Sequence, residues 1–388
     1  LPVFENDLLS RPIHFWRALI AWFGGGLMWV AAFVILLPAN RGGFDVFSSK
    51  SKILKFKRKL TLNERSMTLA KISNDLIPIY IGFTIILWGL LTSLGTDGYT
   101  SLVRALSILS TSGISGPEKV SSDGAGFFGE IVMVIFLLLA LSHNTFYTLN
   151  KNANLKKMLF DPEIRLGLFI ISCITIVLFL KDMSSANSLF DFDKFFIRGL
   201  ESIWGNFFTT FSFITTNGYI SSYWGKYSSS LDLSHITVIF LGLCLFGGGL
   251  ATTAGGVKLL RISILFSTFS SETGKLLYPS SIAGINSKLK NLEISVFMAW
   301  IFFMLFVVSL ALVTLILAMF GMLFEDALIL AVACLTTTGP IIDLLGLEAL
   351  SISQLPFFSK LALVVSMVLG RLEILVALSV ISSALRRA

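Results

Sequence analysis

Apolar residues form long runs along this chain, and polar connections separate the runs. A helix that spans a bilayer needs about 20 mostly apolar residues, and seven stretches approach that length. They are residues 17–37, 76–94, 131–149, 166–180, 236–266, 294–320 and 361–385, and glycines interrupt the fifth. The pattern predicts an all-α integral membrane protein with about seven spanning helices.

The composition supports this fold class. Of 388 residues, 55% are hydrophobic and only 14% are charged, whereas soluble domains average about 25% charged residues. This excludes an ordinary soluble enzyme and a disordered chain. The net charge of +7 is spread between the apolar runs rather than gathered in one basic domain, so we expect membrane lipid as the surroundings and no nucleic-acid partner. The three cysteines stand inside apolar runs, where we expect them to be buried.

Alternating charge in the connections indicates the topology. Residues 40–75, 150–165, 258–293 and 386–388 together hold 20 Lys and Arg but seven Asp and Glu. Because Lys and Arg concentrate on the cytoplasmic side, we expect these segments and the C-terminus inside, and the N-terminus of this sequence outside. The outer set holds nine Lys and Arg against fifteen Asp and Glu. An acidic outer surface concentrates cations, although acids also collect outside for topological reasons alone.

Three outer connections contain a second, shorter apolar stretch that ends in Thr, Ser and Gly. These stretches are residues 99–115, 195–221 and 325–340. Their apolar parts are too short to span a bilayer, so they fit half-helices that enter the membrane and turn back. Irregular backbone at that depth is tolerated only where protein buries it or where it lines a wet cavity.

The order of helix, re-entrant loop and helix therefore occurs three times, which predicts repeated units around a central pore. We divide the chain into residues 1–75 (a second helix of repeat one with a basic cytoplasmic loop), 76–165 (repeat two), 166–293 (repeat three) and 294–388 (repeat four). The first helix has no preceding partner and the sequence begins with Leu. We expect that the first helix and pore loop of repeat one are missing from this sequence.

The loop ends carry neutral oxygen atoms and no carboxylate beside the glycine. Rings of backbone carbonyls replace the hydration shell of K⁺ in known filters, whereas divalent cations usually need carboxylates. We therefore expect an easily dehydrated monovalent cation such as K⁺ as the transported ion, although each loop end alone would also fit an ordinary helix C-cap. The candidate filter residues are Thr111, Ser112, Gly113, Thr215, Thr216, Asn217, Gly218, Thr337, Thr338 and Gly339.

Two further features suggest a gate. Residues 247–258 hold five glycines, each of which costs about 1 kcal/mol in a helix relative to Ala, so we expect a loop at mid-membrane rather than closely packed helix. Arg371 lies inside the last apolar run, where a charge usually faces a water cavity or a partner, although snorkelling to the inner surface is the alternative. The candidate gate residues are Gly247, Gly248, Gly249, Thr252, Thr253, Gly255, Gly256, Lys258 and Arg371.

Catalytic chemistry is not indicated by the sequence. His14, His143 and His235 are isolated, and no metal-ligand spacing or Ser/His/Asp arrangement suggests an enzyme. We expect a transport protein without an organic cofactor.

At these residues the chain resembles the TrkH family of bacterial potassium uptake proteins, within the Trk/Ktr/HKT superfamily. The segment from Phe15 to Gly25, with Leu36-Leu-Pro38, resembles the family's F-W-R-x-L-x-Q-W-x-G-G…I-L-P. The pore-loop, glycine-rich and charged motifs also match in order: Ser110-Thr-Ser-Gly113-Ile-Ser115, Thr215-Thr-Asn-Gly218-Tyr219, Leu335-Thr-Thr-Thr-Gly339-Pro340, Gly247 to Lys258, and Gly370-Arg371-Leu-Glu373.

Some positions depart from the family's pattern. Thr336 and Thr337 replace two Asn of repeat four, and Asn217 replaces the third Thr of T-T-T-G-F in repeat three. In the glycine-rich motif, Leu250, Thr252 and Ala254 stand where the family favours Ala, Ser and Gly. These differences bear on ion preference and gating.

The resemblance implies further properties. Members are homodimers with one pore in each protomer, and a cytosolic nucleotide-binding TrkA-type regulatory subunit attaches below. The resemblance thus implies the pore-forming subunit of a Trk-type system in a bacterial cell inner membrane, with channel-like conduction or symport left open. The alternatives are a sodium-conducting or sodium-coupled relative and a truncated, non-conducting membrane protein.

Overall fold

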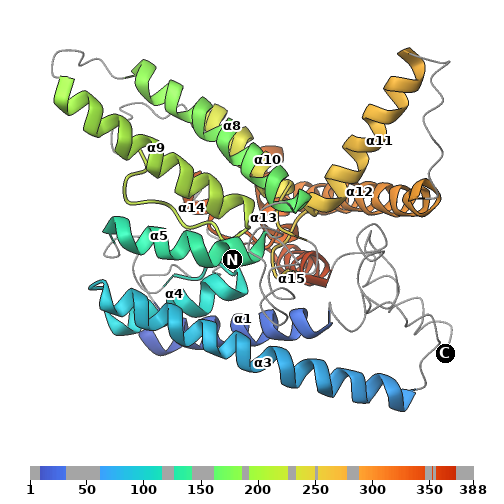
Figure 1. The fold of residues 1–388 in the computed structure, drawn as a ribbon, viewed down its shortest axis with the longest axis horizontal. Coiled ribbons are helices and arrows are strands. Elements are labelled where there is room, and N and C mark those ends of the chain that lie inside the picture. The colour runs from blue at the N-terminus through green and yellow to red at the C-terminus, as the bar shows by residue number, and fades with distance from the viewer. Residues whose placement is uncertain are drawn as a thin grey trace.

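The computed structural model describes residues 9–31, 62–115, 126–141, 161–185, 192–225, 233–249, 252–277, 288–345, 352 and 355–372. All structural statements below concern these residues, which are almost entirely helical (Figure 1). Most of the predicted cytoplasmic connections, His143, and the last predicted span beyond Leu372 lie outside the described residues.

After a single first helix, the chain forms three successive groups, each with a long helix followed by two further helices. The single helix is α1 (Arg11–Ala31). The three groups are α3 (Leu62–Ser93), α4 (Gly98–Ser110) and α5 (Gly126–Leu137) with η4 (Leu138–Ala140); α8 (Pro162–Ser185), α9 (Phe192–Ile214) and α10 (Leu233–Leu245); and α12 (Lys288–Met319), α13 (Phe324–Leu335) and α15 (Phe357–Leu372). In addition, α11 (Leu259–Leu277) follows α10, and the short α14 (Ile341–Leu344) follows α13. The domain boundaries chosen from the sequence stay a prediction.

Three of the described helices are long and apolar enough to cross a membrane. Their apolar parts, Leu76–Ser93, Glu163–Ser184 and Val296–Met319, correspond to the second, fourth and sixth predicted spans. The apolar helices at Gly126–Ala140 and Ile236–Leu245 are shorter. The predicted fifth span is divided into α10 and α11 by the glycine-rich segment, as the glycines indicated.

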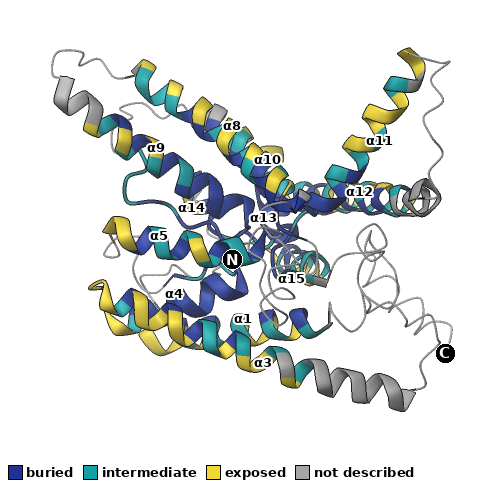
Figure 2. Cartoon of the chain, in the orientation of Figure 1, coloured by how far each residue is buried: buried dark blue, intermediate teal, exposed yellow. Residues whose placement is uncertain are grey.

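The burial pattern is that of a protein surrounded by lipid. Large apolar side chains such as Phe169 (68% exposed) and Val308 (61% exposed) face outward, while the buried residues lie toward the centre (Figure 2) and include many Ser and Thr beside the apolar core. Such an exterior would drive aggregation in water, but it matches the hydrocarbon core of a bilayer. Cys173 on α8 is exposed, so the expectation that all three cysteines are buried is wrong there: α8 turns that side to the apolar exterior.

The second helix of each group runs into this polar centre. Helix α4 packs against α1 and α3, α9 against α8, and α13 against α12 and α15. Glu325 and Asp326 lie in the first turn of α13, where acids stabilise a helix N-terminus. Helices α4 and α13 are short, with 13 and 12 residues; α9 has 23 residues, and its C-terminal part is buried. Their C-terminal ends bring the Thr-Gly motifs to the middle of the molecule.

Candidate ion filter and glycine-rich segment

The three central helices end in the same hydrogen-bonded turn. We call the residues that follow them the α4 loop (111–115), the α9 loop (215–221) and the α13 loop (336–340). The N–H of Thr111 bonds the carbonyl of Ile108, and the N–H of Ser112 bonds that of Ser107. The same pair of bonds, three and five residues back, starts from Thr216 and Asn217 and from Thr337 and Thr338. This pattern is the Schellman motif.

A threonine occupies the left-handed position of each motif. The φ angles are 47° at Thr111, 57° at Thr216 and 58° at Thr337. Glycine usually stands there, because a β-branched residue is strained in that region by about 1–3 kcal/mol. Among the described residues, these three are the non-glycine residues with positive φ. Strain repeated at matched positions indicates that the threonine side chains have a role that glycine cannot supply.

Two of the three loops are tied back to their own helix by a hydrogen bond to a serine seven residues earlier. The hydroxyl of Ser107 accepts the N–H of Ile114 at 2.8 Å, and the hydroxyl of Ser212 accepts the N–H of Tyr219 at 2.6 Å. In the α13 loop the corresponding residues are Ala333 and Pro340. Alanine has no hydroxyl and proline has no N–H, so both partners of the bond are absent together and no polar group is left unpaired.

The predicted filter residues come together at this centre. The N–H of Gly113 donates to the side-chain oxygen of Asn217 at 3.0 Å, which joins the α4 and α9 loops. Pro340 of the α13 loop lies beside Gly218. Thr111, Thr215, Thr216, Asn217 and Thr338 are almost completely buried. Because the C-terminal end of a helix dipole is negative, three such ends provide a favourable environment for a cation.

The glycine-rich segment, residues 247–258, crosses directly against these loop ends. The hydroxyls of Thr253 and Thr111 are 2.9 Å apart, and the N–H of Gly255 donates to the hydroxyl of Thr216 at 2.9 Å. A Cβ on Gly255 would stand 2.0 Å from the carbonyl oxygen of Thr336 and 2.9 Å from the hydroxyl of Thr337. Only glycine permits that approach. The segment therefore reaches all three left-handed threonines.

Backbone bonds fix both ends of the segment to the surrounding helices. The N–H of Gly248 donates to the carbonyl of Ile214, and the N–H of Gly249 to that of Ala140. At the other end the N–H of Val257 donates to the carbonyl of Leu245 at 2.8 Å. Leu250 and Ala251 lie outside the described residues. The described part of the segment is thus non-helical and hydrogen-bonded to its neighbours at both ends.

Two cationic side chains bind consecutive carbonyls of the segment. Arg371 donates from one guanidinium nitrogen to the carbonyl of Thr253 and from another to the carbonyl of Ser110, both at 2.8 Å. The ammonium of Lys258, itself buried, donates to the carbonyl of Ala254. Arg371 thereby joins the segment to the C-terminal end of α4, where a cation is electrostatically favoured.

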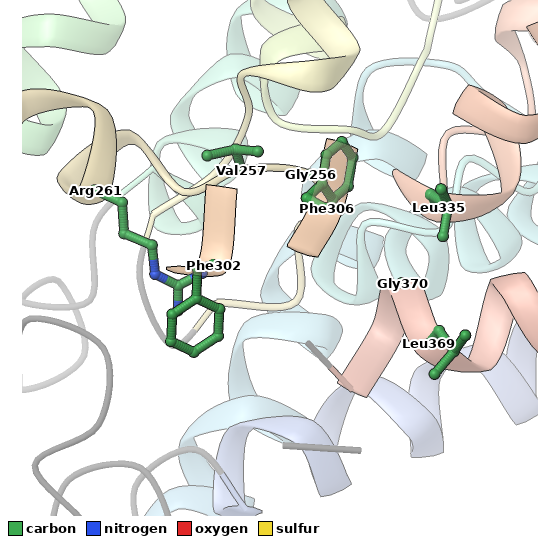
Figure 3. A pocket seen from close by; sticks show the side chains of 8 residues that line it. All are labelled: Gly256, Val257, Arg261, Phe302, Phe306, Leu335, Leu369 and Gly370. Carbon is green, nitrogen blue, oxygen red and sulfur yellow. The ribbon is translucent and has the colours of Figure 1, made fainter. Parts of the chain in front are cut away.

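A small pocket lies beside the glycine-rich segment, lined in part by Gly256 and Val257 (Figure 3). The guanidinium carbon of Arg261 stands 3.6 Å from the centre of the Phe302 ring, a cation–π contact. The lining residues come from the segment and from α11, α12, α13 and α15: Gly256, Val257, Arg261, Phe302, Phe306, Leu335, Leu369 and Gly370. The pocket provides mostly apolar space next to the segment.

The sequence argument missed Glu130, which organises the outer side of the α9 loop. Its fully buried carboxylate accepts hydrogen bonds from Trp204 Nε1 at 2.6 Å and from the Ser221 hydroxyl at 2.9 Å. It also accepts the N–H of Ser222 at 3.0 Å. The sequence feature that could have revealed Glu130 is its position directly before the third apolar run. A charge at the edge of a membrane span usually has a specific partner.

This fold and this site define a membrane transport protein built from helix, pore loop and helix units. A family model described as "TrkH: Cation transport protein" matches residues 125–385, about two thirds of the chain. The chain belongs to the TrkH family of cation transport proteins.

Curated relatives and a solved structure agree with that assignment. An uncharacterized cation transporter of Methanocaldococcus jannaschii is 25% identical over 375 residues, covering 95% of this chain and 70% of the relative. The Trk system potassium uptake protein TrkH of Escherichia coli K12 is 24% identical over 381 residues, covering 95% and 72%. The crystal structure of the potassium transporter TrkH from Vibrio parahaemolyticus superimposes with a TM-score of 0.75 at 23% identity, covering 97% of this chain and 73% of that one.

We predict that Glu130→Gln destabilises the protein. Glutamine places an NH₂ donor against the donors that now face a carboxylate, and hydrogen bonds to charged groups contribute about 1.5–3 kcal/mol. Thermal unfolding in detergent should show a clear fall in Tm. Glu325→Gln is the matched control, because Glu325 is exposed at the start of α13 and its interaction with the helix dipole is worth below about 1 kcal/mol. Equal falls in Tm for the two variants would show that the hydrogen bonds of Glu130 contribute no more to stability than the exposed Glu325 does.

Proposed function

We propose that this chain forms the ion-conducting pore of a Trk-type potassium uptake system. The observation that carries the proposal is the threefold turn in which Thr111, Thr216 and Thr337 adopt the same left-handed conformation at converging helix ends. Relatives of this chain from Escherichia coli and Vibrio parahaemolyticus bear the names of potassium transport proteins, which supports the choice of ion.

The chemistry of the loops suits a weakly hydrated monovalent cation. The α4, α9 and α13 loops contain hydroxyl, amide and carbonyl oxygens and no carboxylate. Neutral carbonyl dipoles can replace the water shell of K⁺, whereas a divalent ion generally requires charged ligands. Backbone carbonyls of the candidate filter residues would coordinate K⁺, and the threonine hydroxyls would support the backbone.

The direct test is ion flux through the reconstituted full-length protein. We predict that K⁺ flux into proteoliposomes exceeds Na⁺ flux, and that Gly218→Ser lowers this ratio by roughly tenfold. Gly218 has a φ of 81°, and a Cβ there would stand 3.0 Å from Pro340, so serine strains the α9 loop. Gly82→Ser on α3 is the control, since nothing lies within 4 Å of a Cβ at that position. A wild-type ratio at or below one would favour a sodium-conducting protein, and no flux of either ion would favour a non-conducting one.

We also propose that the glycine-rich segment is the gate. Its contacts with Thr111, Thr216 and the α13 loop place it across the ends of all three filter loops. Arg371 and Lys258 occupy the carbonyls of Thr253 and Ala254, which a passing cation would otherwise contact. Conduction then requires the segment to leave the loop ends.

Arg371→Ala is predicted to raise the leak of K⁺ through the closed pore by about tenfold. The substitution removes one hydrogen bond to the segment and one to α4, and bonds from charged donors are worth about 1.5–3 kcal/mol each. It also removes a positive charge that repels cations. Tracer efflux from loaded proteoliposomes measures the leak. Lys360→Ala, the same loss of charge earlier on α15, should leave the leak at the wild-type level, and a leak unaltered by Arg371→Ala would show that the arginine does not hold the gate.

The proposal extends to the assembly. Relatives named as components of a Trk system suggest that this pore also works with a cytosolic regulatory subunit of the TrkA type and assembles as a homodimer. The basic connections predicted to face the cytoplasm are compatible with such a partner.

A further inference from the structure

The side chain of Asn217 makes a hydrogen bond to a neighbouring loop, which its counterparts in the other two loops do not. It occupies the position after the left-handed threonine, as Ser112 and Thr338 do in the α4 and α13 loops. The Ser112 hydroxyl stays within its own group, bonding Ser110 at 3.0 Å and Ser107 at 3.3 Å. The Thr338 hydroxyl bonds Thr336 of its own loop at 3.2 Å. Only the Asn217 side chain reaches a different loop, at the N–H of Gly113.

The reason is side-chain length. The oxygen of a serine or threonine is attached directly to Cβ, whereas the asparagine oxygen lies one bond further out and can cross the gap between loops. The backbone carbonyl of Asn217 also packs against Gly113, 2.1 Å from where a Cβ would stand. The side-chain oxygen and the backbone carbonyl of Asn217 therefore both contact Gly113 and define the position of its peptide group. One residue further along, the Tyr219 hydroxyl donates to the carbonyl of Ile114 at 3.0 Å, so a second bond joins the same two loops.

The bond is buried within the protein, and burial increases its contribution to the stability of the two loops. Asn217 is fully buried, and a buried N–H left without an acceptor costs considerably more free energy than an exposed one. The orientation of the amide is fixed by this bond, since the N–H of Gly113 can face only the oxygen.

We propose that Asn217 is a specificity-determining residue whose side-chain oxygen fixes the spacing between the α4 and α9 loops and thereby the ion preference of the pore. The inference rests on the proposed filter function. In the cavity-size account of K⁺ selectivity, a filter excludes Na⁺ because its carbonyls do not close around the smaller ion, and a bond between neighbouring loops opposes that closure. A threonine at this position is too short to make the bond, so a filter with the pattern T-T-T-G-F needs a different contact between the two loops.

The test compares Asn217→Thr with Asn217→Asp in the full-length protein reconstituted into liposomes. Asn217→Thr removes the acceptor, so we expect the K⁺ over Na⁺ flux ratio to fall by roughly tenfold. Asn217→Asp keeps an oxygen at the same place, and because position 217 is fully buried the uncharged carboxyl group is favoured there, so we expect a ratio within about twofold of wild type. Asn206→Thr is the control: this buried asparagine of α9 bonds Asp182 away from the loops, and its loss should leave the ratio unchanged.

A second readout separates this inference from the filter function itself. Amide hydrogen exchange of a peptide containing Gly113 should become roughly fivefold to tenfold faster in Asn217→Thr and stay slow in Asn217→Asp. Unchanged amide exchange at Gly113 in a folded Asn217→Thr variant would show that the Asn217 side chain does not protect the Gly113 N–H. Faster exchange with an unchanged flux ratio would overturn its role in specificity, and a wild-type protein without K⁺ preference would overturn the filter function instead. If Asn217→Thr fails to fold, a folded Asn217→Asp variant with lost selectivity or fast exchange contradicts the proposal, and wild-type values of both support it.

Discussion

The contact between three left-handed threonines and one glycine-rich segment is the constraint on which the centre of this molecule depends. A threonine in that conformation is strained, and the strain occurs at Thr111, Thr216 and Thr337 alike. In each case the side chain lies toward the segment, through Thr253 or Gly255. Glycine would relieve the backbone but would remove the hydroxyl. The strained backbone at the three helix ends thus keeps three threonine hydroxyls at the surface that contacts the segment.

The rest of the architecture supports that contact. An apolar exterior suits a bilayer, and many polar residues are buried at the centre, where most of them have hydrogen-bond partners. Helices α4, α9 and α13 bring their negative ends there, and two cations, Arg371 and Lys258, bind carbonyls of the segment beside them. These charges are stable because they face helix ends and carbonyl oxygens. In the proposed pore the same charges would oppose a cation in transit, so closure of the segment would act through electrostatics as well as through steric blockage.

Much of this fold was predictable because its signals are local. Apolar length indicated the spans at Leu76–Ser93, Glu163–Ser184 and Val296–Met319, five glycines indicated the break between α10 and α11, and Thr-Gly ends indicated where α4, α9 and α13 stop. The sequence did not reveal which residue would take the left-handed angle, because glycine stands only two positions further on at Gly113 and Gly218 and is the usual choice. Nor did it reveal the partners of Glu130 or the reach of Asn217. Those contacts join residues about 90 or 100 positions apart, and no local pattern encodes them.

Locking the glycine-rich segment onto the filter loops tests the central claim most directly. The hydroxyls of Thr111 and Thr253 are 2.9 Å apart, so Thr111→Cys with Thr253→Cys places two sulfur atoms within reach of a disulfide. Cys173, which is exposed, is replaced by serine in the same protein. The account predicts that K⁺ flux into proteoliposomes falls to the background level when the pair is oxidised and returns when the disulfide is reduced, while either single variant is insensitive. Equal flux in the cross-linked and reduced protein would contradict the account, because ions would then pass without the segment leaving the loops.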